Sequence, residues 1–345
     1  MDNRIKHLYS LPDLTRTPSP VKIVLDAILA LPRFQKFDII QIPEIVTVTE
    51  NFDLLGIPMD HPARKVTDTY YLDHQHVLRT QTTTMWSYYL PNRNLQDPTS
   101  VLCYGKVYRN DEVDKTHYPC FHQLDGLYLT KQKITKQDLV DVLVDIAKAV
   151  YGPDIQWQVL DDHFPFTDPS IELGIRFGDT WLEVLGAGIV HPQVLKNFNI
   201  NPQEYNGWAF GFGLDRLAMI KMGIPDIRIL WSKDPRITQQ FTSLSSVYTP
   251  VSNFPDTRRD VTFLIDKNFN HLTLFDLIRS LDNDTIEEVK LVDRFENDKK
   301  FGSRVSLSFR IIYRSHERTL TSDEVNATQS LIREKIVTDL KGELR

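Results

Sequence analysis

Six strand-like segments follow one another between residues 65 and 213, and this order limits the folds open to the chain. Helical periodicity interrupts or follows them only at residues 135–152 and 214–223. Successive strands with few helices between them do not suggest a doubly wound parallel sheet. They predict a mostly antiparallel sheet flanked by helices, an α+β fold. The six segments are KVTDTYYL (65–72), SVLCYGKVYRN (100–110), HQLDGLYL (122–129), IQWQVLDDHFPF (155–166), SIELGIRFGDTWLEVLGAG (170–188) and NGWAFGFG (206–213).

The chain before residue 65 is less regular. Residues 1 to about 20 are rich in Pro, Ser and Thr and predict a loose start. VKIVLDAILALPRF (21–34) predicts an amphipathic helix that stops near Pro32. FDIIQIPEIVTV (37–48) predicts an extended segment, in which Pro43 cannot occupy a central ladder position.

A Ser/Thr/Pro-rich stretch at residues 242–259 breaks the pattern, which then restarts on a smaller scale. Strand, helix, strand, polar turn and strand are followed by a helix that begins near Thr321 with the capping box TSDE. This β-α-β-β-α order predicts a ferredoxin-like domain. We therefore expect a first domain at residues 1–245 with an N-terminal extension at 1–20, a linker at 246–256 and a second domain at 257–345.

The second domain has a strand, RVSLSFRI, with two unlike faces. Its odd-numbered residues are apolar, and its even-numbered residues are Arg304, Ser306, Ser308 and Arg310. This alternation predicts one face covered by helices and one that is polar, basic and open. Lys and Arg between residues 253 and 345 total 16 against 17 Asp and Glu, so a solvated face is the alternative to a nucleic-acid surface. The basic cluster comprises Lys299, Lys300, Arg304, Arg310, Arg314 and Arg318.

Composition excludes several classes of protein. The chain has 345 residues, 41% of them hydrophobic, and a net charge of −6, which is typical of a globular protein of one large and one small domain. Cys103 and Cys120 have no Cys-x-x-Cys spacing, which disfavours a zinc-cysteine cluster or a disulfide scaffold and favours a reducing compartment. No apolar run approaches the roughly 18–20 residues of a membrane span. The N-terminus shows neither a secretory nor a transit-peptide layout.

Two stretches carry polar residues in strand-like surroundings. GKVYRNDEVDKTHYPCFHQLDGLYL (105–129) contains Arg109, His117, Gln123 and Asp125. A functional site and a structural ion network are about equally consistent with it. In WAFGFGLDRLAMIKMGIPDIR (208–228), Arg216 occupies the third glycine position of a dinucleotide fingerprint, so that interpretation is weak and a packed strand-to-helix corner is the alternative. The spacing of His117, His122 and the DHQH at 73–76 fits no strong metal pattern and favours solvated or hydrogen-bonding histidines.

Together, the two stretches resemble motifs 2 and 3 of the class II aminoacyl-tRNA synthetases. Several segments are similar to phenylalanyl-tRNA synthetases, and IIQIPE resembles the weaker motif 1. RRDVTFLID and HERTLTSDEV resemble the ferredoxin-fold anticodon-binding domain, and the fusion of both parts resembles the single-chain, mitochondrial-type enzymes. The similar segments are VYRNDEVDKTHYPCFHQLDG, HFPFTDPSIE, WLEVLGAGIVHP, GWAFGFGLDRLAMIKMGIPDIR and NFDLLGIPMDHPARK.

The resemblance implies an enzyme that activates phenylalanine with ATP and Mg²⁺ and transfers it to the terminal ribose of tRNA(Phe). Arg109 would bind the α-phosphate and Arg216 the terminal phosphates, because a planar guanidinium suits fixed phosphate contacts. Both would be catalytic, together with His117 as a phosphate contact. Phe121 would stack on adenine. Asp111 would help to order ATP, and Glu183 would be a magnesium ligand.

The resemblance also implies an amino-acid pocket. Gln123 and Asp125 would receive the ammonium group, Phe164 and Phe166 would hold the phenyl ring, and Ala209 would close the pocket at the para position.

Gln81 and Thr83 belong to the same pocket, at positions where the family usually has His and Ser. Asp125 is one methylene shorter than the usual Glu, which would allow a water-mediated ammonium contact.

Further expectations come from the same resemblance. Arg304 and Arg310 would bind tRNA, the enzyme would be a monomer, and it would work in the mitochondrial matrix if eukaryotic and otherwise in the cytoplasm. A catalytically inactive paralogue that binds tRNA or an amino acid is one alternative. A class II synthetase for another amino acid is a second, which the intact FPF (164–166) and Ala209 disfavour.

Overall fold

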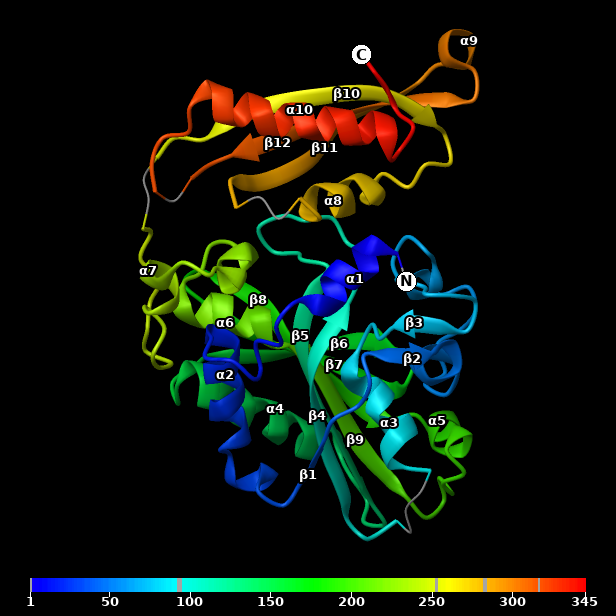
Figure 1. The fold of residues 1–345 in the computed structure, drawn as a ribbon. Helices are drawn as coiled ribbons and strands as arrows, with labels where there is room; N and C mark the ends of the chain where they lie inside the picture. Colours follow the sequence, from blue (N-terminus) through cyan, green and yellow to red (C-terminus); the bar gives the residue numbers. More distant parts are fainter. Residues whose placement is uncertain (1, 92–94, 252–253, 282–283, 316) are drawn as a thin grey trace. The chain divides into compact units, whose positions relative to one another are not determined.

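A computed structural model describes residues 2–91, 95–251, 254–281, 284–315 and 317–345 (Figure 1). The chain forms two compact units. The larger comprises Tyr9–Arg109 and Cys120–Tyr248, and the smaller comprises Met1–Leu8, Asn110–Pro119 and Thr249–Arg345. Residues 252 and 253 of the predicted linker lie outside the described residues. Within the described residues, no helix combines the length and apolar character that a membrane crossing requires.

A seven-stranded sheet organises the larger unit. Its strand order is β1-β4-β5-β9-β8-β7-β6 (Figure 1). Only β1 runs parallel to its neighbour, and every other pairing is antiparallel. The predicted α+β fold is therefore confirmed. The strands are β1 (Asp38–Ile40), β4 (Thr99–Tyr108), β5 (Cys120–Thr130), β9 (Asn206–Gly213), β8 (Thr180–Val190), β7 (Thr167–Phe177) and β6 (Trp157–Phe164).

Three helices cover one face of this sheet: α2 (Pro20–Leu29), α4 (Lys136–Tyr151) and α6 (Leu214–Met222). They pack on one another, and α4 also contacts β7 and β8 while α6 contacts β5. Thr135 begins α4 with a capping box closed by Asp138, which satisfies backbone N–H groups at the helix start. The sequence predicted all three helices.

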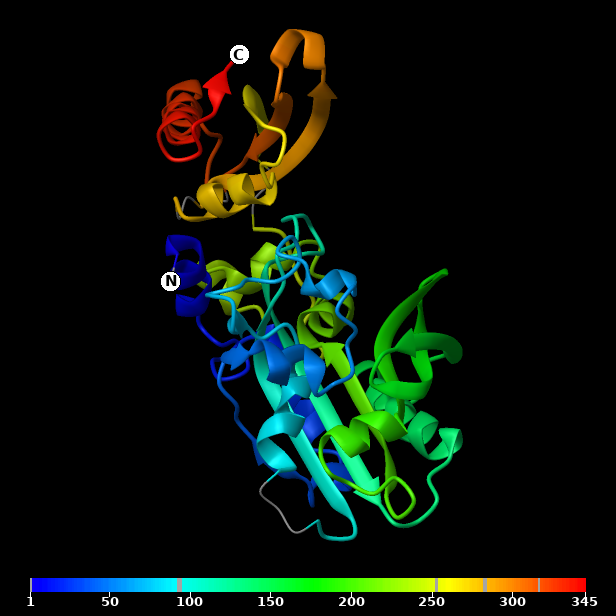
Figure 2. The same cartoon turned by 90° about the vertical axis from the view of Figure 1, so that its right-hand side faces the viewer.

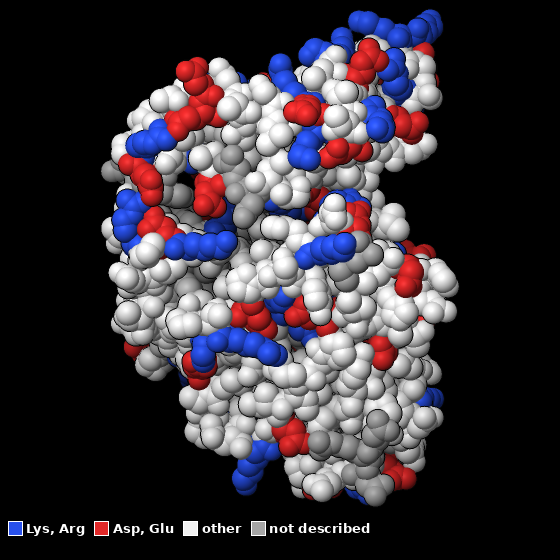
Figure 3. Space-filling view, in the orientation of Figure 1, with Lys and Arg blue, Asp and Glu red and all other residues white. Residues whose placement is uncertain are grey.

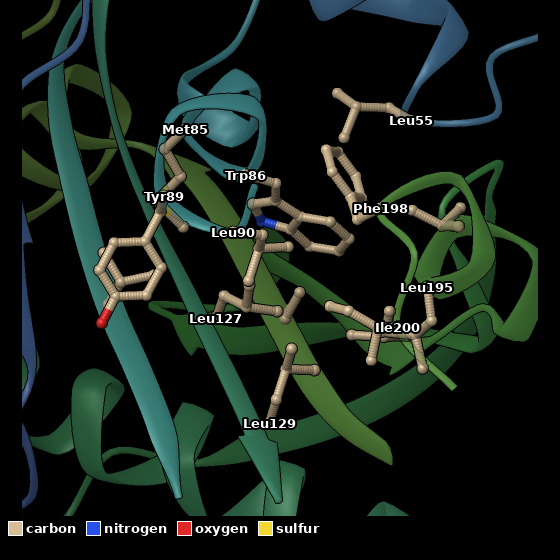
Figure 4. Packing of buried hydrophobic residues seen from close by; sticks show 14 of the residues in the cluster. Leu55, Met85, Trp86, Tyr89, Leu90, Leu127, Leu129, Leu195, Phe198 and Ile200 are labelled. Carbon is tan, nitrogen blue, oxygen red and sulfur yellow. The ribbon is translucent and has the colours of Figure 1, made fainter. Parts of the chain in front are cut away.

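The opposite face is covered by shorter elements. They are η4 (Thr82–Thr84), α3 (Met85–Tyr89), α5 (Pro192–Asn197), the π-helical turn η2 (Thr49–Asp53) and a small sheet of β2 (Ile45–Thr47) and β3 (His76–Leu78). An apolar cluster packs η2, α3 and α5 against the sheet (Figure 4). At its centre the Trp86 ring lies 6.3 Å from the Phe198 ring and 6.5 Å from the Phe166 ring. Shorter turns elsewhere in the chain are η1 (Pro32–Phe34), η3 (Pro62–Arg64), η5 (Ile227–Trp231) and α7 (Pro235–Thr238).

Two local predictions were wrong. The N-terminal segment is not loose: α1 (Asn3–Ser10) is helical, and the buried Lys106 ammonium donates to the carbonyls of Tyr9 and Leu11 at 2.8 Å each. These bonds tie the segment to the sheet. KVTDTYYL (65–72) is a turn instead of a strand, because two backbone N–H groups bond to the carbonyl of Lys65; only an isolated bridge involves this segment.

The smaller unit contains the predicted β-α-β-β-α order. Its sheet order is β11-β12-β10-β13. The long helix α10 lies against one face of it, as Figure 2 shows, and the capping box of Thr321 and Glu324 begins that helix as predicted. The polar turn contains one extra helical turn, α9. The elements are β10 (Thr257–Asp266), α8 (Leu272–Arg279), β11 (Ile286–Glu296), α9 (Asp298–Phe301), β12 (Arg304–Tyr313), α10 (Ser322–Thr338) and β13 (Glu343–Leu344).

Candidate active site

The predicted amino-acid residues lie on the sheet face that η4 covers. Alternate residues of a strand point to the same face, so β5 presents Phe121, Gln123, Asp125 and Leu127 together. The register sets β9 beside them: Gln123 pairs with Gly213, Asp125 with Gly211 and Leu127 with Ala209. Small residues therefore alternate along β9 on the same face, opposite the larger polar side chains of β5.

Two glycines, Gly186 and Gly211, lie side by side on this face and leave the sheet there without side chains of its own; we call this place the glycine floor. Gly211 of β9 pairs with Gly186 of β8. A Cβ built at Gly211 would meet Oδ1 of Asp125 at 2.5 Å, and one built at Gly186 would meet Cζ of Phe164 at 3.0 Å. The carboxylate and the aromatic ring therefore lie over neighbouring glycines of paired strands.

Two aromatic side chains lie together at this site. The rings of Phe164 and Phe166 stack with centroids 6.0 Å apart and an interplanar angle of 9°. Ala209 is buried and lies opposite Gly188 on the same face, two residues before Gly211. The structure therefore gathers Phe164, Phe166, Ala209 and Asp125 on one region of the sheet, and their roles in amino-acid binding stay predictions.

Asp125 is a buried carboxylate that forms no ion pair with another described residue. It is 2% exposed, and its two oxygens accept hydrogen bonds from the hydroxyls of Thr82 and Thr83. Burial raises the pKa of Asp125 to about 6, while the two hydroxyls and the charges of Arg79 and Arg109 act in the opposite direction. In the described part of the chain, no Lys, Arg or His nitrogen forms an ion pair with it.

Gln123 adds a second buried acceptor beside this carboxylate. Its Oε1 is buried, and within the described residues it has no hydrogen-bond partner. Buried polar atoms are satisfied in the great majority of cases, and the exceptions call for an explanation. Because Gln123 and Asp125 are alternate residues of one strand, their side chains lie on the same face, with Cα atoms about 6.6–6.8 Å apart. A donor with several N–H groups, such as an ammonium ion, would satisfy both.

Hydrogen bonds with Asn51 anchor the turn that carries Thr82 and Thr83. Asn51 exchanges hydrogen bonds with Thr80 at 3.0 and 3.1 Å, and Gln81 donates from Nε2 to the Asn51 carbonyl at 3.3 Å. The structure thus places Gln81 in contact with the backbone of η2. Thr82, which the sequence interpretation missed, contacts the carboxylate as Thr83 does.

The predicted nucleotide residues of the larger unit lie at the other end of the face. The guanidinium of Arg109 lies 5.2 Å from the centre of the Phe121 ring. A Cβ built at Gly213 would find Phe121 at 3.9 Å as its nearest neighbour. Arg216 is exposed in the first turn of α6, whose N-cap is Gly213 and has no capping side chain. Uncapped N–H groups and an arginine favour an anion at this helix start.

His122 and Asp215 tie these elements together, a contact that the sequence did not reveal. His122 Nε2 accepts the N–H of Leu14 at 3.0 Å, so Nδ1 carries the proton and faces the Asp215 carboxylate at 3.2 Å. Asp215 also accepts the backbone N–H of His122 at 2.6 Å. The hydrogen-bonding role predicted for this histidine is confirmed. The pair fixes β5 to the start of α6 and hence Phe121 relative to Arg216.

A β-bulge brings Glu183 onto the same face. Leu173 pairs with Leu185 but Gly174 pairs with Glu183, so β8 contains one extra residue at this point. The bulge turns Glu183 toward the face of Gly186 and Glu172. Burial raises the pKa of Glu172, and the charges of Glu183 and Asp162 raise it further, whereas Arg216 lowers it.

No three His, Cys, Asp or Glu side chains among the described residues gather as a metal site. Mg²⁺ commonly uses one or two carboxylates, substrate phosphates and water. The mutual repulsion of Glu172 and Glu183 fits a cation at this place. Glu172 alternates with apolar residues in SIELGIRF, and this pattern was the available signal for its position on the site face.

Asp111 and His117 belong to the smaller unit, in its segment Asn110–Pro119. Asp114 organises that segment. Burial opposes its ionisation, but hydrogen bonds from His117 and Thr116 outweigh burial and lower its pKa to about 2. The His117 ring is therefore held by Asp114 within its own loop. The roles predicted for Asp111 and His117 stay predictions.

The residues predicted to bind tRNA lie on the open face of the smaller unit's sheet. The apolar side of β12 is buried against α8 and α10, as the alternation predicted. On the other side, Arg310 makes two hydrogen bonds of 2.9 Å to Asp260, and Arg304 pairs with Glu343. Figure 3 shows this unit from the side of α10, and on that side basic and acidic side chains are also interspersed. Much of the predicted basic character is thus paired with acids.

Comparisons with known proteins identify the family. A family model described as "tRNA synthetases class II core domain (F)" matches residues 13–241, and one described as "Ferredoxin-fold anticodon binding domain" matches residues 252–345. The crystal structure of pyrrolysyl-tRNA synthetase from Desulfitobacterium hafniense is similar with a TM-score of 0.50 and 19% identity, covering 71% of this chain and 81% of that one. At this identity the likeness shows the fold alone.

Curated relatives are more specific. The chain is 38% identical over 326 residues to the chloroplastic/mitochondrial phenylalanine–tRNA ligase of Arabidopsis thaliana, covering 91% of this chain and 73% of that protein. It is 36% identical over 371 residues to the probable mitochondrial phenylalanine–tRNA ligase of Drosophila melanogaster, covering 91% and 80%. The resemblance found in the motifs is confirmed, and the chain belongs to the phenylalanine–tRNA ligase family of the class II aminoacyl-tRNA synthetases.

Proposed function

We propose that this chain activates phenylalanine with ATP and transfers it to tRNA(Phe), and that the amino acid lies on the glycine floor of Gly186 and Gly211. The observation that carries this proposal is the pair of buried acceptors that Gln123 and Asp125 present on β5. Gln123 Oε1 lacks a donor and Asp125 lacks a cation among the described residues, while an aromatic pair lies over the neighbouring glycine. An α-ammonium group and a phenyl ring would satisfy these two features together.

The face orders the substrates along β5. Phe121 and Asp125 are separated by four residues, which is about 13–14 Å in a strand. Adenine at Phe121 and ammonium at Gln123 and Asp125 would thus follow one another along β5. The phenyl ring at Phe164 and Phe166 would lie to one side of β5, over β8. The phosphates would lie near Arg109 and Arg216, beside the uncapped start of α6.

The reaction needs no nucleophile from the protein. The phenylalanine carboxylate attacks the α-phosphorus of ATP and pyrophosphate leaves; the terminal ribose hydroxyl of tRNA then attacks the acyl carbon and AMP leaves. The protein contributes position and charge stabilisation through Arg109 and Arg216. Mg²⁺ held by Glu183 and Glu172 would neutralise charge on the departing pyrophosphate. In the smaller unit, His117 would add a phosphate contact and Asp111 would help to order ATP.

ATP–pyrophosphate exchange across the standard amino acids tests this function. Phenylalanine should support exchange far better than any other amino acid. A protein that exchanges with none of them is the inactive paralogue, and one that prefers another amino acid is a synthetase of different specificity. The intact phosphate and aromatic residues favour the active phenylalanine enzyme over both.

For the smaller unit we propose tRNA binding through the open face of β12. Its support is the match of residues 252–345 to an anticodon-binding family and the partly exposed Arg304 and Arg310. Replacing both arginines by Gln should reduce the salt dependence of tRNA affinity, because fewer counterions are released. Arg333→Gln on α10 is the matched control, since α10 covers the other face. Equal effects of the double variant and the control would refute this face as the tRNA surface.

The relatives' names suggest an organelle enzyme, and we expect the mitochondrial matrix if the source is eukaryotic and the cytoplasm otherwise. Residues 1–245 would form the catalytic domain and residues 257–345 the anticodon-binding domain. We expect a monomer, as in the single-chain type. Light scattering coupled to gel filtration would test the monomer, since a dimer would double the mass of 40.1 kDa.

A further inference from the structure

Thr82 has no role in the function proposed so far, yet it is fully buried and contacts the residue on which ammonium recognition depends. Its hydroxyl donates to Oδ2 of Asp125, and the hydroxyl of Thr83 donates to Oδ1. Each carboxylate oxygen has further acceptor capacity. The two threonines therefore fix the carboxylate without using up the acceptors that an ammonium group needs.

The position of the carboxylate is determined from both sides. Gly211 leaves room for it on the sheet, since any Cβ there would meet Oδ1 at 2.5 Å. The threonines reach it from η4, a turn that contacts β4 and β5 and is anchored through Asn51. A short Asp side chain is thus held between a glycine and two hydroxyls.

The charged groups around Asp125 do not contact it directly. Arg79 donates to the carbonyls of Lys106 and Ile42 at 2.7 and 2.9 Å. Arg109 is the first residue after the end of β4. The charges of both guanidinium groups lower the pKa of Asp125 without a hydrogen bond to it. Cys103, opposite Asp125 on β4, has its thiol pKa raised to about 12 by burial and is neutral. Among the described residues, the side chains that bond to the carboxylate are therefore the two threonines.

We propose that Thr82 is a positioning residue of the amino-acid site, which holds the Asp125 carboxylate over Gly211 in its ionised, ammonium-accepting form. This inference rests on the proposed function. It assigns part of phenylalanine affinity to a hydroxyl that need not touch the substrate. The consequence is specific: without the hydroxyl, the carboxyl keeps its proton to higher pH and binds the ammonium group less well.

Thr82→Val removes the hydroxyl at nearly constant volume, and Thr82→Ser keeps it. Thr84→Val is a matched control, because Thr84 is equally buried on the same turn but donates to the Gln81 carbonyl at 3.1 Å instead of to Asp125. The measurement is phenylalanine-dependent pyrophosphate exchange between pH 5 and 8.5, with KM for phenylalanine and for ATP determined separately.

We expect Thr82→Val to raise KM for phenylalanine about tenfold at pH 5 and only about twofold at pH 7, where the Asp125 carboxyl of the parent protein is mostly ionised, with little change in KM for ATP. The acidic limb of kcat/KM for phenylalanine should move up by about one pH unit, which corresponds to that tenfold change. Thr82→Ser should restore both values, and Thr84→Val should leave the limb in place. If Thr82→Val does not fold, Thr82→Ala compared with Thr82→Ser gives the same test.

An acidic limb that stays in place in Thr82→Val, or that moves equally in Thr84→Val, would overturn the positioning role while leaving the function intact. A parent protein without phenylalanine-dependent exchange at any pH would overturn the proposed function, and the role of Thr82 with it.

Discussion

The Asp125 carboxylate lies directly over Gly211: a Cβ at residue 211 would meet Oδ1 at 2.5 Å, closer than real Cβ contacts allow. The contact joins β5 to β9 at the centre of the candidate site. This contact excludes a side chain at residue 211, although the backbone there does not have the positive φ that favours glycine.

Gly211→Ala should therefore displace the carboxylate and raise KM for phenylalanine tenfold or more. The control is Gly213→Ala on the same strand, where a Cβ would find its nearest neighbour at an ordinary 3.9 Å. Its KM for phenylalanine should stay near that of the parent protein. Steady-state pyrophosphate exchange measures both, and equal KM values for the two variants would refute the steric role of Gly211.

Phenylalanine affinity should fall as the pH drops through about 6, because burial raises the pKa of Asp125 to about that value and only the ionised carboxylate attracts ammonium. The effect on folding has the opposite sign. A carboxyl whose pKa is raised in the folded protein binds its proton more tightly there, so this group favours the folded state increasingly as the pH falls from about 6 toward 4. Titrating KM for phenylalanine and the melting temperature from pH 5 to 8 tests both signs. Asp125→Asn should abolish the pH dependence of KM, and a parent protein with a flat profile would contradict this assignment.

Ala209 should set the para boundary of the pocket. It is buried on the floor two residues from Gly211, in the cluster against which Phe166 packs. An unpaired hydroxyl costs only ~1–3 kcal/mol on mutational scales, so rejection of tyrosine has to be largely steric. Ala209→Gly should admit para-chlorophenylalanine and raise tyrosine activation, and Ala209→Val should weaken phenylalanine itself. Unchanged activation ratios in the glycine variant would show that another residue forms this boundary.

Arg109 and Arg216 should each contribute to adenylate formation by binding phosphate. Charge-assisted contacts are worth ~1.5–3 kcal/mol, so the alanine variants should lose ten-fold or more in exchange rate while their melting temperatures stay near that of the parent. Lysine at either position keeps the charge but loses the planar fork and should restore activity only in part. Exchange near the parent rate in an alanine variant would remove that arginine from the site.

Much of the fold could be predicted because period-two alternation along β5, β7 and β12 assigns each residue to a face. Phe121, Gln123 and Asp125 were assigned to the site through the family resemblance, and the alternation of β5 explains why they share one face. The strand predicted from the local sequence at residues 65–72 was wrong, because a backbone turn at Lys65 forms there in spite of the strand-like composition. The prediction for the N-terminal segment was wrong as well, since its order comes from Lys106 and His122, residues about a hundred positions away.

The contacts that complete the site were beyond sequence reasoning for the same reason. Thr82 reaches Asp125 across 43 positions, and Asp215 reaches His122 across 93. Such pairings depend on which strands become neighbours, and a single sequence does not state that. The bulge that turns Glu183 onto the site face is equally invisible, because it depends on the register between β7 and β8.

The central claim is that Gln123 and Asp125 form a receptor for the α-ammonium group, and a matched pair of inhibitors tests it most directly. Phenylalaninol keeps the ammonium group and lacks the carboxylate, whereas 3-phenylpropionate keeps the carboxylate and lacks the ammonium group. In phenylalanine-dependent pyrophosphate exchange, phenylalaninol should inhibit the parent protein at least tenfold more strongly than 3-phenylpropionate, and Asp125→Asn should remove most of that difference. Equal inhibition of the parent protein by both compounds, or a difference that survives in Asp125→Asn, would contradict the account.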